Sequence, residues 1–592
     1  MTGRLTWRDA EAAAERLTPG DRRTLQLLAR LPLIWEYAIE QLCGLQGDTS
    51  VYRGLIRLRA LGLIAEVRPA LHAGRNAGLH YLTDLGIATV AVDRQVDPAY
   101  LAWHARLRGL DLRRRLLRLL HLLALYQMLA ALADVRAGRI DLLAWEQPWR
   151  RSFRLPMRKA PVTVNLPAYA VLSWDDDAAE YLLLPDLATF PLRAHGQTFR
   201  WLATLRRRVG STFPTLVVAT TDDRQMAWVR LLDEAARSRG CAPLGARIVT
   251  WQSLRDDMYA LGDAATATRP STTVGVVRPS LRPLDPRRSG RPIPRLVGAV
   301  CRPDASTSED LGCLALQVSP MERVLLDVVG RHPFLTAESL ATILGWQVRR
   351  VRARRARLIG LGLVRLLGAG ERRESLPGDL PELTQTGLAF VAAQQGLSLP
   401  RAVRFNGLAG GGPEHPTGMR RLLLRDLEHT LGTDAVFVGL YRQFEATAEK
   451  KGGDALLEWR NAAACGRRRV RPDGYGMIRR NGELYGFFLE YDRGTMSVRD
   501  YDAKWAGYHD YRDSRAFERD YDGFPTILVV TTNKTAEERI ARSARAAAVG
   551  RWAPLPILLT CEWRISIDHA NHDGLFGPIW RDPHDGVASR RR

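Results

Sequence analysis

The sequence contains one ordered set of segments twice, and this repetition restricts the chain to folds built from two related halves. Residues 58–64 (LRALGLI) match residues 358–364 (LIGLGLV), and residues 213–221 (FPTLVVATT) match residues 524–532 (FPTILVVTT). The offset between matching segments rises slowly from 300 to 311 residues, and their order is kept. We therefore predict a tandem duplication of a unit of about 250 residues.

Each copy is predicted to begin with a helical domain and to end with alternating strands and helices. Between the copies, residues 256–318 are rich in Pro, Arg, Ser and Thr, which is typical of an extended linker. The predicted domains are residues 1–100, residues 101–255, the linker 256–318, residues 319–398 and residues 399–592.

The helical domain of the second copy carries a strongly basic helix. Apolar periodicity predicts helices over residues 321–330 and 347–361, with a short helix capped by Thr336 between them. A strand, a turn, and a returning strand and helix follow, so residues 319–398 are predicted to form a winged helix-turn-helix. We expect the longer helix to contact DNA phosphates and one or two guanine edges. The arginines predicted to bind DNA are Arg349, Arg350, Arg352, Arg354, Arg355 and Arg357.

The matching helix of the first copy has fewer basic residues, namely Arg53, Arg57 and Arg59. Residues 1–100 are therefore interpreted as a degenerate winged helix, whose helix serves packing more than DNA.

The charge balance favours nucleic acid as the partner. The chain has 86 basic and 64 acidic residues, a net charge of +22 and a pI near 10.3. All but five of the basic residues are arginine, a skew that a GC-rich genome would produce. Such a genome does not explain the excess of base over acid, so double-stranded DNA is the predicted partner.

The chain is predicted to be cytoplasmic. Its six cysteines are widely spaced and form no C-x-x-C pair, which fits a reducing compartment. The most apolar stretch, residues 116–134, contains Arg118, His121 and Gln127, so we expect a buried helix and no membrane association. The sequence has no G-x-x-x-x-G-K-[ST] motif, so no nucleotide cofactor is expected.

Three acids of the second copy are spaced to meet at one end of a sheet. Asp473 opens one predicted strand and Glu490 lies in the next, so a hairpin would place both at the same end. Asp492 lies two residues beyond Glu490 and is expected on the same face. Such a set can bind Mg²⁺ or Mn²⁺, which polarises a phosphate and lowers the pKa of an attacking water. Lys504 and Tyr508 lie four residues apart on the following helix and are predicted to hold the phosphate or the transition state.

These residues resemble the PD-(D/E)xK nuclease superfamily through Pro472-Asp473 and the E-x-D sequence at residues 490–492. Asp492 stands where the usual lysine is expected, and K-x-x-x-Y at residues 504–508 is similar to the Q-x-x-x-Y helix of some members, with a relocated lysine. The resemblance implies a mixed sheet with flanking helices and a metal-dependent nuclease site. The implied site residues are Asp473, Glu490, Asp492, Lys504 and Tyr508.

A longer resemblance covers most of the second copy. The ordered motifs L-E-H-T, L-E-W, R-P-D-G-Y, F-L-E-x-D-R-G-T, F-P-x-x-L-V-V-T and G-P-I-W-R make it similar to the replication-relaxation family of bacterial plasmids and integrative elements. The resemblance implies a DNA-binding protein of a mobile genetic element, associated with the nucleoid or a plasmid, that nicks DNA in replication or relaxation. Other replication or conjugation proteins are further expected partners.

The expected fold class is therefore α+β to α/β and multidomain, with two copies of a winged helix-turn-helix followed by a PD-(D/E)xK-like mixed sheet. In the first copy the sheet domain, residues 101–255, is interpreted as degenerate. At an offset of 305 residues the presumed site residues align with residues that bind no metal: Asp473 with Ala168, Glu490 with Pro185, Asp492 with Leu187 and Lys504 with Phe199. Asp186 lies nearby, but this alignment places it on the opposite face of its strand. The cation is therefore expected in the second copy only.

Two roles stay open at this point. His429 suits either a metal ligand or a packing residue, because His121 occupies the matching position in the copy without acids. Tyr491, Tyr501, Tyr508 and Tyr511 surround the acids, and their spacing does not select a covalent tyrosyl–DNA intermediate. Metal-activated water is preferred.

Two other functions compete with DNA nicking. The first is a non-catalytic replication or transcription regulator that binds DNA on a nuclease-like scaffold. The second is an assembly protein whose two halves hold partner proteins.

Overall fold

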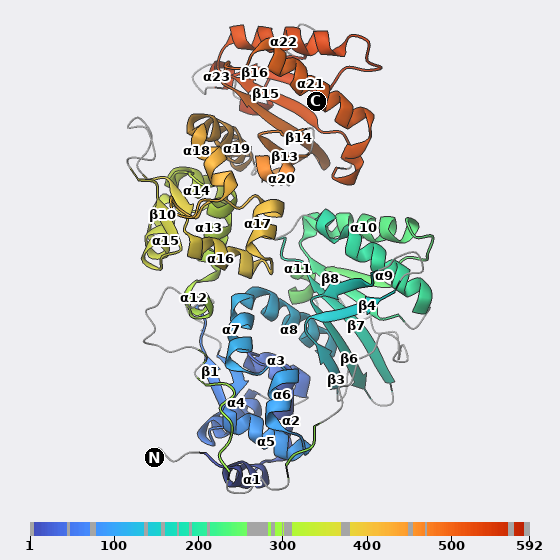
Figure 1. Ribbon diagram of the computed structural model, residues 1–592, viewed down its shortest axis with the longest axis vertical. Coiled ribbons are helices and arrows are strands. Elements are labelled where there is room, and N and C mark those ends of the chain that lie inside the picture. Colours follow the sequence, from blue (N-terminus) through green and yellow to red (C-terminus); the bar gives the residue numbers. More distant parts are fainter. Residues whose placement is uncertain are drawn as a thin grey trace. The chain divides into compact units, whose positions relative to one another are not determined.

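The computed structural model separates the chain into two compact units, Met1–Pro320 and Met321–Arg592 (Figure 1). The residues that the structure describes are 5–43, 48–70, 78–134, 140–154, 160–174, 177–188, 192–209, 213–256, 282–285, 291–298, 300, 311–368, 379–447, 454–467, 470–521, 523–565 and 574–584.

Unit 1 consists of a helical part and a sheet part. The helical part contains α1 (Trp7–Glu15), α2 (Pro19–Arg30), α3 (Glu36–Cys43), α4 (Asp48–Ala60), β1 (Ile64–Val67), β2 (Leu79–Leu82), α5 (Asp84–Arg94), α6 (Pro98–His104), α7 (Gly109–Leu117) and α8 (Leu119–Asp134). The remainder contains β3 (Ile140–Glu146), β4 (Trp149–Phe153), β5 (Val162–Leu166), β6 (Ala168–Trp174), β7 (Asp177–Pro185), α9 (Gly196–Val209), β8 (Thr215–Thr220), α10 (Gln225–Arg237), β9 (Ala246–Thr250), α11 (Trp251–Asp256) and α12 (Leu311–Gln317).

Unit 2 follows a similar order. Its helical part contains α13 (Pro320–Arg331), α14 (Ala337–Leu344), α15 (Val348–Gly360), β10 (Val364–Leu366), β11 (Pro381–Leu383), α16 (Gln385–Gln394), α17 (Leu399–Asn406), α18 (Gly418–Arg425) and α19 (Leu427–Thr447). The remainder contains β12 (Ala455–Asn461), α20 (Ala462–Cys465), β13 (Gly474–Arg480), β14 (Glu483–Asp492), α21 (Val498–Asp513), β15 (Thr526–Thr531), α22 (Lys534–Ala548), β16 (Ile557–Cys561) and α23 (Glu562–Ile565).

The two units contain five-stranded sheets of the same topology. The strand orders are β3-β6-β7-β8-β9 and β12-β13-β14-β15-β16. In both sheets the first three strands are antiparallel and the last two are added in parallel. Both first strands carry a register shift at the matching place, between Leu142 and Ala144 and between Leu456 and Glu458. The mixed α and β architecture agrees with the expected fold class, whereas the nuclease-like fold stays a prediction.

The helical parts also agree in local detail. In each, the basic helix (α4 or α15) leads through a glycine with φ near +70° into a short hairpin, at Gly62 and at Gly362. Such a φ favours glycine because a β-carbon would meet the backbone. Thr83 and Thr384 then cap the returning helices α5 and α16. Helices followed by a hairpin and a return helix are what the sequence predicted, while the winged-helix assignment and the duplication stay predictions.

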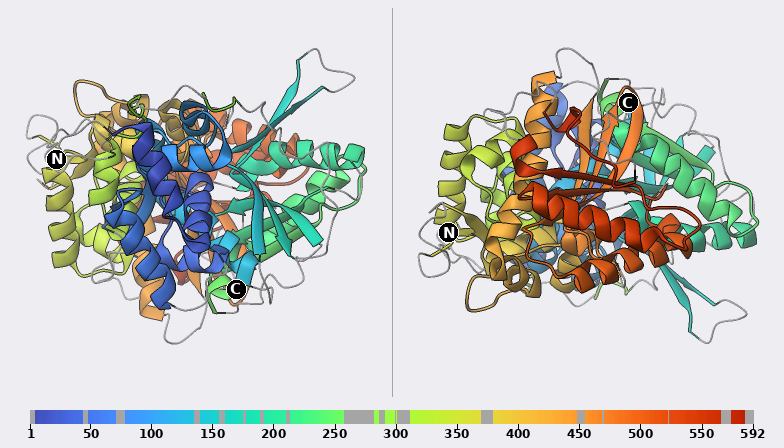
Figure 2. Two further views of the ribbon diagram at one scale, coloured as in Figure 1. Left: turned by 90° about the horizontal axis from the view of Figure 1, so that it is seen from below. Right: turned by 90° about the horizontal axis from the view of Figure 1, so that it is seen from above.

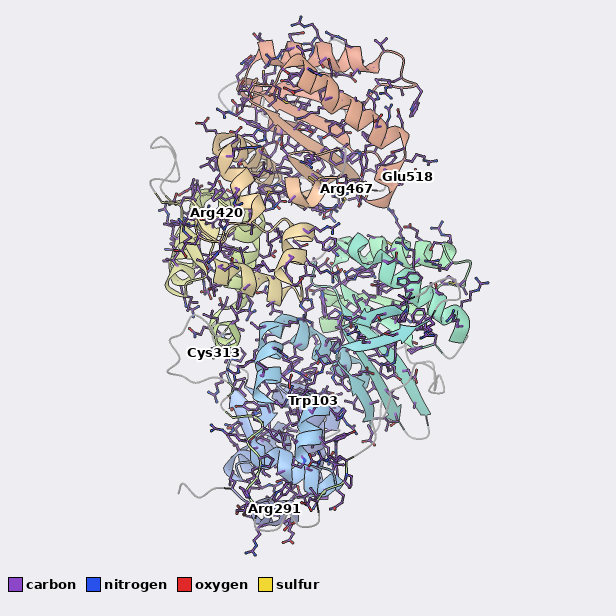
Figure 3. All side chains as sticks on the ribbon, in the orientation of Figure 1. Trp103, Arg291, Cys313, Arg420, Arg467 and Glu518 are labelled. Carbon is purple, nitrogen blue, oxygen red and sulfur yellow. The ribbon has the colours of Figure 1, made fainter. Side chains whose placement is uncertain are left out.

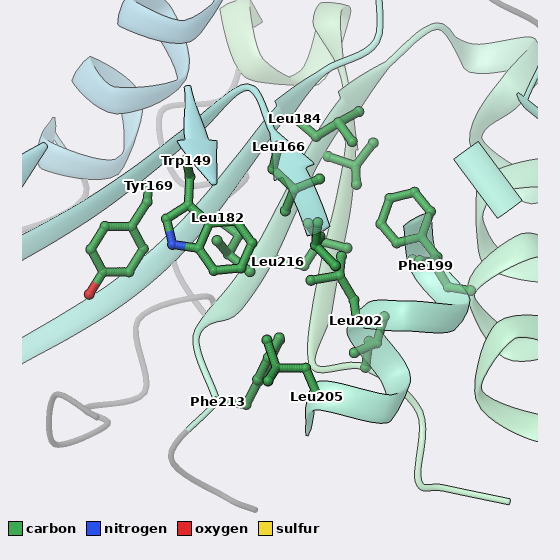
Figure 4. Close-up of a cluster of buried hydrophobic side chains, with 14 of the residues drawn as sticks. Trp149, Leu166, Tyr169, Leu182, Leu184, Phe199, Leu202, Leu205, Phe213 and Leu216 are labelled. Atoms are coloured by element: carbon green, nitrogen blue, oxygen red, sulfur yellow. The ribbon is translucent and has the colours of Figure 1, made fainter. Parts of the chain in front are cut away.

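The core of the first sheet is aromatic and aliphatic (Figure 4). Trp149, from the β4–β5 hairpin, is completely buried, as is Phe199 of α9. Burying one such aromatic side chain stabilises the fold by roughly 2–3 kcal/mol. The first sheet is therefore a packed structure, although it lacks counterparts of Asp473 and Glu490.

The second sheet is covered on both faces, and β14 alternates between them (Figures 1 and 2). Phe487 stacks on Phe437 of α19, with ring centroids 5.9 Å apart. Its neighbour Phe488 faces the other way and lies 5.8 Å from the ring of Tyr508 on α21. Because side chains alternate along a strand, Glu490 and Asp492 share the α21 face with Phe488.

The segment predicted as a linker has structure of its own where it is described. Pro292 forms a β-bridge with Thr6, and Pro283 forms one with Val96. The end of the segment forms helix α12. The described parts of residues 256–318 therefore pack against the helical part of unit 1, because their extended backbone can pair with exposed backbone groups there.

Within the described ranges, no single helix is long and apolar enough to cross a membrane. The segments Pro98–Leu117 and Leu119–Ala133 are long and apolar enough only as a pair, and a bend of 97° separates them.

The start of α16 provides a test of the close packing in the helical part. A β-carbon at Gly387 would collide with the backbone carbonyl oxygen of Leu363, which cannot move without shifting the hairpin. We expect Gly387→Ala to lower the free energy of unfolding of unit 2 by about 1–3 kcal/mol. The matched control is Gly360→Ala, at the end of α15, where nothing lies within 4 Å of the new carbon. Denaturant unfolding followed by tryptophan fluorescence should separate the two variants, and equal midpoints would contradict the packing described.

Candidate functional site

The β13–β14 hairpin brings Asp473 and Glu490 together. Gly474 pairs with Leu489, so one further step of the register places Asp473 opposite Glu490. The backbone N–H of Asp473 donates to the Leu489 carbonyl at 3.0 Å, and the N–H of Tyr491 donates to Asp473 Oδ2 at 2.9 Å. The Asp473 side chain therefore accepts the last hydrogen bond at this end of the β13–β14 hairpin. Opposed residues of adjacent strands have β-carbons about 5 Å apart, so the two carboxylates interact.

Helix α21 supplies positive charge and hydroxyl groups to the acids of β14. Lys504 Nζ lies 2.6 Å from Glu490 Oε2, and the Tyr508 hydroxyl donates to Glu490 Oε1. The Tyr501 hydroxyl donates to Asp492 Oδ2. Tyr501, Lys504 and Tyr508 are spaced by three and four residues, so they form one stripe of the helix.

His429 completes the cluster from the start of α19. Its Nε2 lies 3.0 Å from Asp473 Oδ1, and its ring packs edge-on against Tyr491 with centroids 5.6 Å apart. Glu490 is 2% exposed, whereas Asp473, Lys504 and His429 are between 22% and 29% exposed. The site therefore has one buried acid beneath three groups that solvent or a ligand can reach.

The pKa values of the cluster are shifted as a coupled set. Burial raises the pKa of Glu490 to about 6, and the Asp473 carboxylate adds to the rise against the opposing charge of Lys504. Burial lowers the pKa of Lys504, but the carboxylates of Glu490 and Asp473 raise it more, so the net shift is upward. For Asp473 burial acts upward, yet His429 and Lys504 hold its pKa below the usual value. Shifts of this kind are common at functional sites and also occur in structural ion pairs.

The first sheet shows that Asp492 was assigned to the wrong counterpart. Ala168 pairs with Leu183 as Gly474 pairs with Leu489, so the structural offset is 306 residues and not 305. On this register Asp186 is the counterpart of Asp492, and both acids are at most 5% exposed. Each also accepts a hydrogen bond at 3.0 Å from the N–H two residues on, at Ala188 and at Gly494. The expectation that Asp186 points to the opposite face is therefore wrong.

The same register changes the other counterparts. They are Pro167 for Asp473, Leu184 for Glu490 and Thr198 for Lys504. The first sheet thus lacks Asp473, Glu490 and Lys504 but keeps the third acid. An acid shared by a sheet with the cluster and a sheet without it is explained by its local contacts, which for Asp186 come from Thr220, Arg224 and Trp228.

The donors fit a divalent cation as a pair and not as a set of three. Among the described residues, no three His, Cys, Asp or Glu side chains lie close enough to hold a metal ion. Asp492 is bound by the Gly494 N–H and the Tyr501 hydroxyl. Asp473 and Glu490 remain opposed at the sheet end, and Mg²⁺ commonly takes one or two protein carboxylates with water and phosphate in its other positions.

The tyrosines around the site are buried, and their hydroxyls are already bonded to acids. Tyr491 donates to Glu562 and Tyr511 lies 3.5 Å from Asp520, in addition to the contacts of Tyr501 and Tyr508. All four are at most 8% exposed. Burial beside a carboxylate raises the pKa of each phenol, which disfavours the phenolate that a covalent intermediate needs.

Sequence reasoning missed one neighbour of the cluster. Arg493 follows β14 and binds Asp426, with one N–O distance of 2.9 Å, and Glu428 at the start of α19. The sequence could have indicated this neighbour, because Arg493 directly follows Asp492 and residues at the end of a strand lie close to the last acids of that strand.

The structure divides the six arginines of α15 into two groups. Arg354 and Arg357 bind the completely buried Glu322 of α13, and Arg355 is buried and donates to Asp379. Arg349, Arg350 and Arg352 are exposed. Of these three, only Arg352 forms an ion pair with a described carboxylate, that of Glu338 at the surface. The second half of the helix is therefore bound to the rest of the domain, and the first half is exposed.

The basic helix of unit 1 is held in the same way. The buried Asp21 binds Arg57 of α4 as Glu322 binds Arg357 of α15.

Unit 2 thus combines a helical part that carries the basic helix α15 with a mixed sheet that carries a coupled acid–lysine cluster. Residues 326–527 match the model of a family described as replication-relaxation. The match covers about a third of the chain, includes Asp473, Glu490 and Lys504, and supports the resemblance expected from the sequence. Comparison with curated proteins and with solved structures gave no match.

The ion pair between His429 and Asp473 can be tested by titration. Burial lowers the pKa of His429, but the hydrogen bond and charge of Asp473 raise it more, so its pKa lies above 6.5. The stabilisation from this histidine is complete below about pH 6.5 and is lost as pH rises through its folded pKa. In metal-free Asp473→Asn protein, burial and the charge of Lys504 still lower the pKa of His429 and only Asp426 raises it, so we expect this pKa to fall below its wild-type value. NMR titration of the imidazole protons, assigned with His429→Gln, measures this; an unchanged pKa would show that the pair does not form.

Proposed function

We propose that the protein binds double-stranded DNA of a plasmid or integrative element in replication or relaxation and nicks it at the end of the second sheet. The observation that carries the proposal is the cluster of Asp473, Glu490 and Lys504, partly open to solvent and coupled in charge. The match of residues 326–527 to the replication-relaxation family supports the same cellular role. The predominance of basic residues supports DNA as the substrate.

In this proposal Asp473 and Glu490 hold Mg²⁺ or Mn²⁺. The cation would polarise the scissile phosphate and lower the pKa of an attacking water. Lys504 would neutralise the phosphate oxygens, and Tyr508 would keep Glu490 oriented through its hydrogen bond. Asp492 acts through Gly494 and Tyr501 as a positioning residue and not as a ligand, because Asp186 occupies the same place in a sheet without the cluster. His429 orients Asp473.

One observation favours the non-catalytic regulator as the second candidate. Glu490 already has a cation, Lys504, and a hydroxyl, Tyr508, so it is satisfied without a metal. A buried acid–base pair of this kind can exist for stability and specificity of the fold alone. The two candidates share the DNA contact and differ in cleavage.

A nicking assay separates the two candidates. Wild-type protein with Mg²⁺ or Mn²⁺ should convert supercoiled plasmid to open circles, and Asp473→Ala and Glu490→Gln should each lower the rate by at least about a hundredfold. The control is Glu518→Gln, an exposed acid paired with Arg515 and labelled in Figure 3, which should nick at the wild-type rate. Equal behaviour of wild type and Asp473→Ala would assign the protein to the regulator class.

The division of α15 predicts two different outcomes for its arginines. Arg349→Ala combined with Arg352→Ala should weaken binding to duplex DNA and lower the slope of log affinity against log salt by about two, with an unchanged melting temperature. Arg355→Ala should lower the melting temperature, because it leaves Asp379 without its buried partner. Fluorescence anisotropy and thermal melting measure both. If the first variant retained full affinity, α15 would not lie in the DNA interface.

A further inference from the structure

Unit 1 contains a basic hollow at the ends of two helices. A cavity of about 280 Å³ is lined by Thr204 and Arg207 of α9 and by Ser238 and Arg239 at the end of α10. The guanidinium of Arg239 lies 4.9 Å from the centre of the Trp201 ring, and Arg207 donates to the Arg239 carbonyl at 3.3 Å. The two arginines thus line a space that is several times larger than the roughly 30 Å³ share of one water molecule. The hydroxyls of Thr204 and Ser238 donate to the backbone carbonyls of Arg200 and Ala235.

The positive charge of this hollow is not neutralised by the part of the protein that the structure describes. Neither Arg207 nor Arg239 forms an ion pair with a described carboxylate, whereas many other arginines of the chain do. The Nε of Arg239 is buried and has no hydrogen-bond partner among the described residues. That atom is closed to solvent and is not reached from the hollow, but two guanidinium groups without a carboxylate partner would attract an anion there.

Unit 2 provides an internal control for this corner. The offset of 306 residues aligns the buried Phe199, Leu202 and Leu205 of α9 with the buried Trp505, Tyr508 and Tyr511 of α21. On the same register Asp510 is the counterpart of Thr204, and Asp513 is the counterpart of Arg207.

In unit 2 these two acids lie beside Arg551, which follows α22 as Arg239 follows α10. Arg551 is 3.9 Å from Asp510 and 3.6 Å from Asp513. Arg512 also pairs with Asp513, so the two acids of this corner are matched by two arginines in unit 2. The corresponding corner of unit 1 has Thr204 and Arg207 in place of the acids and is therefore basic, although the surrounding core is alike.

The helix ends do not remove this difference. Each helix C-terminus carries the equivalent of about half a negative charge, which the two guanidinium groups exceed. From the geometry and the charge we infer that Arg207 and Arg239 bind a backbone phosphate of DNA in the hollow that they line with Thr204 and Ser238, so that unit 1 binds the duplex independently of α15. This gives the unit without the acidic cluster a binding role, which goes beyond the proposed nicking at the second sheet.

The test is DNA binding by full-length variants, measured by fluorescence anisotropy on a labelled duplex of arbitrary sequence over a range of salt concentrations. Arg207→Ala with Arg239→Ala should lower the slope of log affinity against log salt by about two and weaken binding by about tenfold or more at low salt. A second variant, Thr204→Asp with Arg207→Asp, copies the acids that unit 2 carries, keeps Arg239 on Trp201 and should weaken binding at least as much. The control, Arg68→Ala with Arg291→Ala, removes the same charge from two exposed arginines of unit 1 that pair with Glu66 and Asp285 (Arg291 is labelled in Figure 3).

Loss of affinity in both pocket variants, with the control unchanged, supports the inference. Pocket variants that bind as tightly as the control overturn it and leave the proposed function intact. If wild-type protein binds no duplex at all, both the inference and the proposed function fail. Pocket variants that lose binding to inorganic phosphate but keep full affinity for DNA would also overturn it, since the hollow would then be a site for a free anion.

Discussion

A carboxylate that is 2% exposed must be neutralised or protonated, and for Glu490 this requirement is met by Lys504 of α21. The sheet end depends on that one contact. The Lys504–Glu490 contact joins α21 to β14. On this face of the sheet Tyr501, Lys504 and Tyr508 form a single stripe that contacts Asp492 and Glu490. Asp473 stands opposite Glu490, and His429 of α19 offsets the charge of Asp473 from the other side. Two like charges can therefore remain side by side because each has its own positive partner, and both stay within reach of a ligand that carries charge of its own.

The two sheets separate the residues that support the fold from those that could support chemistry. Asp186 and Asp492 occupy one position and bind the N–H two residues on, so this acid belongs to the architecture that both sheets share. Asp473, Glu490 and Lys504 are replaced by Pro167, Leu184 and Thr198 in the first sheet. Because both acids and the lysine are absent together, none of the three leaves a buried partner without its opposite charge. The first sheet therefore has a continuous apolar core around Trp149 and Phe199. The corner at Arg207 shows the reverse change, since there unit 1 carries charge that unit 2 neutralises.

The arginines of the chain fall into two groups, those that bind buried acids and those that do not. Arg57 and Arg357 fasten the basic helix of each helical part to a buried acid, and such contacts contribute to folding without reaching DNA. Arg349, Arg350 and Arg352 on the outer half of α15, and Arg207 and Arg239 in the hollow of unit 1, form no such contact with a buried acid among the described residues. Counting arginines in a helix therefore overestimates its contact with DNA, because the inner residues are already neutralised within the domain.

The sequence by itself indicated the matching segments of the two halves, the order of the main helices and strands in the second half, and the meeting of Asp473, Glu490, Lys504 and Tyr508, because hydrophobic periodicity and strand alternation are local properties of the chain. It could not determine the register between the two copies to one residue, and a single step reversed the face assigned to Asp186. Nor could it show which arginines of α15 are neutralised or that Asp492 is bound by Tyr501. These depend on contacts between residues far apart along the chain, such as Glu322 with Arg357, and only the tertiary structure brings such residues together.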